Sequence, residues 1–269
     1  MLEVFQYDFM VRALVAGLAI AIIAPLIGTF LVMRKLSLFA DSLAHVALAG
    51  VAIGLLINVY PVVTAVLACV LAAIAIERLR SGRKIYGDAA LSLFLSGSLA
   101  VALALISLAK GYNINLLNYL FGSITAVSEM DVFIILGLAF VVMSVLLVIH
   151  RQLFFISFDE ESAKVSGLPV WQLNSILMIM SAITVALAMR IVGILLVGAL
   201  MVVPVLAAMQ IANSFRRVMV FAVIFSMISV VGGLMFSFYI NIIAGAAIFL
   251  TALLIFLTAM IFCMSRKAL

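Results

Sequence analysis

The sequence predicts an all-α membrane protein, a polytopic helical bundle of about nine transmembrane spans, with eight as the alternative. Hydrophobic residues fill 69% of its 269 positions and charged residues only 9%, whereas a soluble domain carries about 25% charged residues on its surface. Several uncharged stretches reach the roughly 20 residues that a helix needs to cross a bilayer. Lipid is therefore expected to solvate most of residues 1–269, which we interpret as a single transmembrane domain without an additional soluble domain.

The spans follow from the uncharged stretches. Two of these stretches are long enough for two crossings each, and we expect them to turn at Asn58–Pro61 and near Ser237–Asn241, where turn-forming residues gather. Segment Asn113–Ser128 is too short and polar to span, and is interpreted as a re-entrant or interfacial piece. The predicted single spans are Ala13–Met33, Ala89–Ala109, Val132–Ile149, Val165–Met189 and Ile191–Phe215, and the double ones lie within Val46–Ile76 and Val218–Ser265.

The first stretch is longer than the core of a signal peptide and follows acidic rather than basic residues, so a retained span is expected. With the N-terminus outside, Lys and Arg concentrate in the inner loops, as the positive-inside rule describes for the bacterial plasma membrane. This distribution explains the formal charge of +5 without a nucleic-acid partner. Arg12, Lys110 and Arg190 fall outside, and the inner residues are Arg34, Lys35, Arg78, Arg80, Arg83, Lys84, Arg151, Lys164, Arg216, Arg217, Arg266 and Lys267.

Two ionisable residues, Asp41 and His45, lie on the helix that leads into the Val46–Ile76 stretch and is expected to begin near Ser37. A charge at mid-span costs roughly 2.5–3.5 kcal/mol on insertion scales, so such residues usually have a function. The i, i+4 spacing puts both side chains on one helix face, and a carboxylate with an imidazole suits Zn²⁺ or Mn²⁺. The remaining ligands would come from other helices, water or a second subunit. The alternative is a hydrogen-bonded pair at the helix start with no ion.

The sequence contains no phosphate-binding G-x-x-x-x-G-K-[ST] and no H-E-x-x-H zinc-protease motif. We therefore expect a transport subunit rather than an enzyme, with ATP used by a separate partner if it is used at all. The two cysteines, Cys69 and Cys263, are far apart in apolar runs and are interpreted as small hydrophobic residues rather than a disulfide.

One inner loop is markedly polar. Asp159–Ser166 is predicted to form two short helical turns, ended by Gly167 and followed by a new element at Pro169. A short charged helix of this kind could receive force from a separate motor subunit. The alternative is a solvated connector with no such role.

Five separated stretches occur in the order expected of one known family: Tyr7–Leu14, Leu31–Gly54, Leu116–Ile124, Phe158–Pro169 and Arg190–Ala208. Over essentially the whole chain, the sequence resembles the integral membrane permeases of zinc and manganese ABC importers. The resemblance implies a type II ABC importer-like permease in the cell membrane, with a second permease copy and two copies of a cytoplasmic ATP-binding subunit. An extracytoplasmic protein would deliver the metal.

The resemblance also implies roles for particular residues. Asp41 and His45 would belong to the ion pathway, and residues 157–170 would form the segment that couples to the ATPase. No cofactor is expected to be bound permanently, because Zn²⁺ or Mn²⁺ is the cargo. The coupling residues are expected to be Asp159, Glu160, Glu161 and Gly167, and Glu129 and Asp131 are candidate contacts for the binding protein.

Ala49-Gly50 bears on the metal, because manganese members of the family tend to have proline before this glycine. Zinc is therefore the preferred cargo and manganese the second choice. Three alternatives remain: an ion-coupled secondary metal transporter, in which Asp41 and His45 relay protons; an ABC permease for a metal chelate; and a structural membrane subunit in which the pair has no role.

Overall fold

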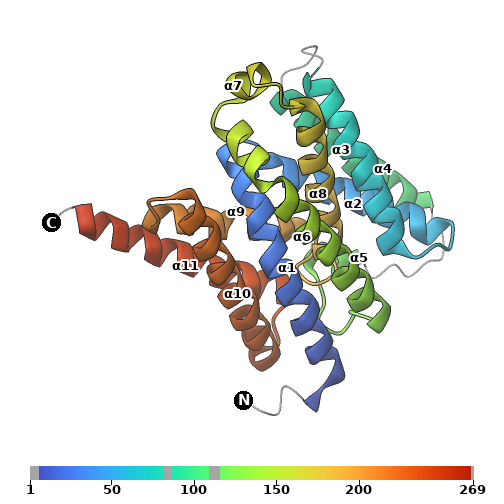
Figure 1. Ribbon diagram of the computed structural model, residues 1–269. Helices are drawn as coiled ribbons and strands as arrows, with labels where there is room; N and C mark the ends of the chain where they lie inside the picture. The colour runs from blue at the N-terminus through green and yellow to red at the C-terminus, as the bar shows by residue number, and fades with distance from the viewer. Residues whose placement is uncertain (1–5, 82–86, 109–115, 268–269) are drawn as a thin grey trace.

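A computed structural model describes residues 6–81, 87–108 and 116–267 (Figure 1). Within these ranges the chain folds into eleven α-helices, and no strand occurs there. The all-α prediction is confirmed. The helices are α1 (Asp8–Met33), α2 (Leu38–Leu56), α3 (Pro61–Ser81), α4 (Gly87–Leu108), α5 (Leu116–Phe121), α6 (Glu129–Phe158), α7 (Glu160–Val165), α8 (Val170–Ala188), α9 (Ile194–Ile211), α10 (Phe215–Ile240) and α11 (Ala244–Lys267).

Eight of the described helices are long and apolar enough to cross a membrane, and α9 has a shorter apolar segment, Leu196–Ile211. Contacts at its two ends show that α9 also traverses the bundle. Arg190, just before α9, pairs with Asp131 at the start of α6, whereas Phe215, just after it, packs on Phe154 near the end of α6. The expected nine crossings therefore correspond to eight long helices and one short one.

The two predicted turns within the long apolar stretches are confirmed. Asn58 ends α2 with a positive φ of 56°, and the amide of Val59 donates to the carbonyl of Gly54 at 2.9 Å. Asn241 ends α10 with the same φ of 56°. Asparagine tolerates this left-handed conformation better than most residues, and it often terminates helices in this way.

The central helices are α1, α2 and α8, whose most apolar windows are 67%, 72% and 67% buried, whereas α4, α6 and α11 are mostly exposed. The exposed hydrophobic surface of the outer helices is what a bilayer would cover. In Figure 1, α7 lies at the end of the bundle opposite the N-terminus, and α11 leads away from the body to the C-terminus. Helix α7 and the N-terminus thus lie at opposite ends of the bundle, as the predicted orientation requires.

Some predicted features lie outside the described residues: Arg83, Lys84, Lys110 and the first part of the expected interfacial segment. The described part of that segment contains the six-residue helix α5 and an irregular stretch that continues to Ser128. Helix α5 packs against α9 and α11.

Candidate functional site

The candidate metal site lies on α2, the most buried of the long helices. A tight turn at Lys35, which has a φ of 58°, separates α1 from α2, and the amide of Leu36 donates to the carbonyl of Leu31 at 2.8 Å. Asp41 falls in the first turn of α2. His45 is one turn further on, about 6 Å along the axis, so the pair lies in the first half of α2.

The carboxylate of Asp41 lies directly against α9. A Cβ atom added to Gly198 would be 1.8 Å from Asp41 Oδ1, so only a glycine leaves room for the carboxylate in this position. On the neighbouring stripe of α2, the Ser42 hydroxyl lies 3.0 Å from the carbonyl oxygens of both Leu38 and Leu91. The Ser42–Leu91 hydrogen bond joins α2 to α4, and the contact of Asp41 with Gly198 joins α2 to α9. Together they determine where Asp41 lies along the bundle.

His45 is half-buried, and its Nδ1 atom is buried without a hydrogen-bond partner among the described residues. No hydrogen bond or ion pair joins Asp41 to His45, both of which the structure describes. The interpretation of the two as a hydrogen-bonded pair at the helix start therefore lacks its expected contact. A buried nitrogen without a partner is costly, and coordination of a metal ion would satisfy it.

The two residues make a partial site. Within the described part of the chain, no group of three or more His, Cys, Asp or Glu side chains could hold a metal together. A structural zinc site has four protein ligands, whereas sites that exchange ligands keep positions open. The arrangement can therefore hold a divalent ion through one carboxylate and one imidazole, with water or another subunit completing the shell.

The local structure of the expected coupling segment is as predicted. Asp159 is the N-cap of α7, and its carboxylate accepts a hydrogen bond of 2.9 Å from the amide of Ser162. Hydrogen bonds from the Ser162 hydroxyl and amide lower the pKa of Asp159. Gly167 has a φ of 81°, and the amide of Leu168 donates to Ala163 at 3.1 Å in the pattern that glycine typically uses to end a helix. Glu161 is exposed.

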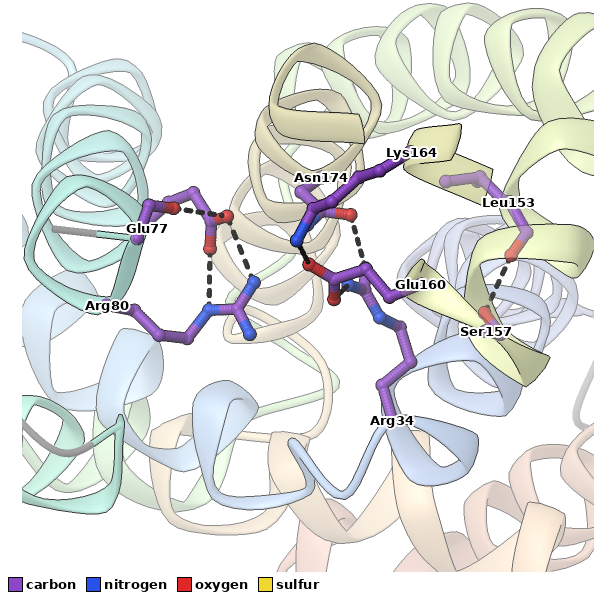
Figure 2. A network of polar contacts seen from close by, with 9 residues as sticks. Arg34, Glu77, Arg80, Leu153, Ser157, Glu160, Lys164 and Asn174 are labelled. Carbon is purple, nitrogen blue, oxygen red and sulfur yellow. Dashed lines mark hydrogen bonds and ion pairs between the residues drawn. The ribbon is translucent and has the colours of Figure 1, made fainter. Parts of the chain in front are cut away.

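Glu160 connects α7 to the rest of the bundle (Figure 2). Its carboxylate accepts hydrogen bonds from Lys164 at 2.8 Å and from Arg34 at 3.3 Å. The Arg34 guanidinium also donates to Asn174 Oδ1 of α8 at 2.7 Å, and its side chain is only 6% exposed. Arg34 therefore ties the end of α1 to both α7 and α8.

Neighbouring positive charges keep the carboxylate of Glu160 ionised. Burial raises the pKa of Glu160, but the hydrogen bond and charge of Lys164, with the charges of Arg34 and Arg80, outweigh burial and hold that pKa below its ordinary value. From the sequence, Glu160 is predictable as a coupling residue, but its partners are not. The charge pattern marks Arg34 only as an inner positive charge, and the sequence predicts no role for Asn174, although an amide inside an apolar span is a usable signal.

The outer end of the bundle has its own polar cluster. Arg190 binds both carboxylate oxygens of Asp131, at 3.2 and 2.9 Å, and the hydroxyl of Tyr60 donates to Asp131 at 2.6 Å. The guanidinium also lies 5.3 Å from the ring centre of Tyr119. Burial lowers the pKa of Arg190, but the charge and hydrogen bond of Asp131 outweigh burial and raise it above its ordinary value.

This cluster changes the expectation for Asp131. Its side chain is fully buried, so it is not a surface contact for a binding protein in this conformation. The capping box that it forms with Ser128, with hydrogen bonds of 3.0 and 3.1 Å, turns it inward. Glu129 remains at the surface with a side chain that is 79% exposed, and it pairs loosely with Arg12 at 3.7 Å.

These features define a class of protein: a polytopic helical membrane protein with a carboxylate and an imidazole one turn apart on its most buried long helix and a short charged helix at one end of the bundle. The chain belongs to the ABC 3 transport family, whose model matches residues 6–263. This membership confirms the resemblance found from the sequence.

Named relatives cover nearly the whole chain. A probable metal transport system membrane protein of Treponema pallidum is 37% identical over 89% of this chain and 90% of its own length. The high-affinity zinc uptake system membrane protein ZnuB of Haemophilus influenzae is 30% identical over 95% and 98%. The manganese transport system membrane protein MntC of Listeria monocytogenes is 32% identical over 96% and 91%.

Solved structures agree on the fold. PsaBC from Streptococcus pneumoniae, solved in complex with Fab, aligns with a TM-score of 0.85 and 31% identity over 95% of this chain and 92% of the matched chain. An inward-facing conformation of a putative metal-chelate type ABC transporter aligns with a TM-score of 0.65 at 16% identity. The second match concerns the fold alone.

Proposed function

We propose that this chain is the membrane permease subunit of an ATP-driven importer for a divalent transition metal, with zinc as its preferred cargo. The observation that carries the proposal is the Asp41 and His45 pair on α2, the most buried of the long helices. Relatives of this chain are named for zinc or manganese transport. A buried imidazole nitrogen without a partner, one turn from a carboxylate, fits transient binding of such an ion.

The ion would pass through a site with few protein ligands. Two ligands from one chain bind a divalent ion weakly, which suits a transporter because the ion must leave as readily as it enters. A metal-binding protein outside would deliver the ion, and the exposed Glu129 is the proposed contact. A separate subunit would bind ATP, because this chain carries no phosphate-binding loop of its own. The family resemblance implies two copies of each subunit.

Helix α7 would receive the force of the ATPase and pass it to the rest of the bundle. Closure of the ATPase dimer would press on α7, whose two ends are capped by Asp159 and Gly167. Glu160 would pass the movement to Arg34. Because Arg34 lies only one short turn before α2, a shift there changes the position of Asp41 relative to α9.

The test is metal uptake in cells that lack the native system. Radioactive zinc uptake should require the candidate ATPase and should be abolished in both Asp41→Ala and His45→Ala while the protein still assembles. Asp88→Ala is the matched control, because Asp88 is an exposed carboxylate in the first turn of α4. Uptake without the ATPase would indicate a secondary transporter, and normal uptake in both site variants would refute the site assignment.

The preference for zinc has a separate test at Ala49. The amide of Ala49 lies four residues after His45 in α2, where a helix bonds it to the carbonyl of His45. A proline at position 49 would remove this hydrogen bond and expose a carbonyl oxygen, a ligand type that Mn²⁺ accepts. We expect Ala49→Pro to raise manganese uptake relative to zinc. An unchanged ratio in a variant that still transports would count against this account of selectivity.

A further inference from the structure

An apolar groove of about 780 Å³ runs along the outside of the bundle between α1, α6 and α10. Its volume is within the range of about 300–1,000 Å³ that is usual for small-molecule sites. The groove is far from the Asp41 and His45 pair in sequence and has no part in the proposed ion pathway. Its apolar walls include Ile22 and Leu26 of α1, Met143 and Leu147 of α6, and Val220 and Val223 of α10.

The mouth of the groove is positively charged. Arg151 of α6 and Arg216 of α10 line it together with His150. Both arginines are exposed, and neither forms an ion pair within the described ranges of the chain. Arg216 is in the first turn of α10, where the N-cap Ser214 makes no side-chain hydrogen bond to the helix, so the positive end of the helix dipole also faces this region.

With α6 crossing the bilayer from Glu129, the arginine end of the groove would lie near the inner membrane surface. Arg151 follows Glu129, the first residue of α6, by 22 residues, which is roughly 33 Å along the helix at 1.5 Å per residue. The hydrocarbon core is about 30 Å thick. Phe154 and Phe215, whose rings are 4.8 Å apart and tilted edge to face, line the same end of the groove. An acyl chain in the groove would therefore place its headgroup beside the arginines.

We propose that this groove binds an anionic phospholipid of the inner leaflet. The phosphate lies between Arg151 and Arg216, and an acyl chain occupies the apolar walls. Basic pockets between transmembrane helices on the cytoplasmic side have this chemistry. A soluble anion would satisfy the arginines but leave the apolar groove unfilled, and a neutral lipid would fill the groove but leave both charges without a partner. A bound lipid would brace α6 and α1, which lead to α7 and to Arg34 respectively.

Arg217 provides a matched control. It is exposed and adjacent to Arg216 on α10, and no ion pair is found for it in the described residues, but it does not line the groove. If Arg151 and Arg216 were ordinary interfacial charges, Arg217 would contribute equally to lipid binding. The proposal instead predicts a difference between neighbouring arginines.

The experiment is native mass spectrometry of the purified full-length permease, titrated with phosphatidylglycerol or phosphatidylcholine. Wild type and Arg217→Gln should retain phosphatidylglycerol in preference to phosphatidylcholine. Each groove arginine is expected to contribute about 5-fold in affinity, so Arg151→Gln/Arg216→Gln should bind phosphatidylglycerol roughly 25-fold more weakly. Equal binding by the double variant and Arg217→Gln would refute the proposal.

A second variant keeps the test valid if the double variant folds poorly. Val220 lines the groove but is 52% exposed, so Val220→Trp should fill the groove from its lipid-facing side while both arginines remain. It should reduce phosphatidylglycerol binding as the charge variant does. A disulfide between two copies through Val220→Cys, in a background without Cys69 and Cys263, would place a second permease in the groove and overturn the proposal.

Discussion

Gly198→Ala would move the carboxylate of Asp41 without changing its chemical identity. The added Cβ would lie 1.8 Å from Asp41 Oδ1, a distance well below the 3.0 Å that real Cβ atoms keep. The nearest backbone atom, the amide nitrogen of Asp41, would be 3.4 Å away, so the helices themselves need not move. The carboxylate must therefore retreat by more than about 1 Å, which exceeds the ±0.2 Å tolerance of metal–ligand distances.

The expected result is a loss of metal binding without a loss of fold. Changes to groups that position a ligand typically cost roughly 10- to 100-fold in metal affinity, so zinc uptake at limiting zinc should fall by a comparable factor. The control is Gly137→Ala, since a Cβ there meets nothing within 4 Å. Wild-type zinc affinity in Gly198→Ala, with Asp41→Ala inactive, would refute the idea that α9 positions the carboxylate.

Three further predictions concern the polar clusters. Asp131→Asn leaves Arg190 without its charged partner, and breaking a buried ion pair costs about 3–5 kcal/mol, so thermal unfolding in nanodiscs should occur at a lower temperature than in Glu129→Gln; equal melting temperatures would contradict this reading. Because the pKa of Glu160 is lowered, its ion pairs stabilise the protein fully above the ordinary pKa of 4.5 and are lost as pH falls through the lowered value. The stability difference between wild type and Glu160→Gln should accordingly vanish at low pH, and a constant difference would show that charge is not the cause. Glu160→Gln should also weaken the coupling of ATP hydrolysis to uptake through Arg34, measured as hydrolysis per ion transported.

Much of the fold was predictable because the bilayer imposes simple rules on a sequence. Every backbone polar group must be satisfied within the membrane, so long uncharged stretches become helices. Their ends are marked by residues with local conformational preferences, such as Asn58, Asn241 and Gly167, which all adopt a positive φ at a helix end. The caps of α7 at Asp159 and Gly167 were predictable for the same reason, because they depend on residues within one turn.

The candidate site was only partly predictable. The sequence showed that Asp41 and His45 share a helix face, since spacing along a helix determines this. It did not show that Gly198, more than 150 residues later, makes room for the carboxylate. It also suggested a surface role for Asp131, which the structure buries against Arg190.

The amino-acid sequence by itself therefore determined the class of fold, the positions of most spans, and the placement of Asp41 and His45 on one face of one helix. These properties depend on local hydrophobicity, charge and turn chemistry. Only the tertiary structure decided which charges are paired, as with Arg34 and Glu160, and which are left at the mouth of a groove, as with Arg151 and Arg216. The physical reason is that pairing depends on contacts between helices far apart in the chain, and such contacts leave no periodic trace in the sequence.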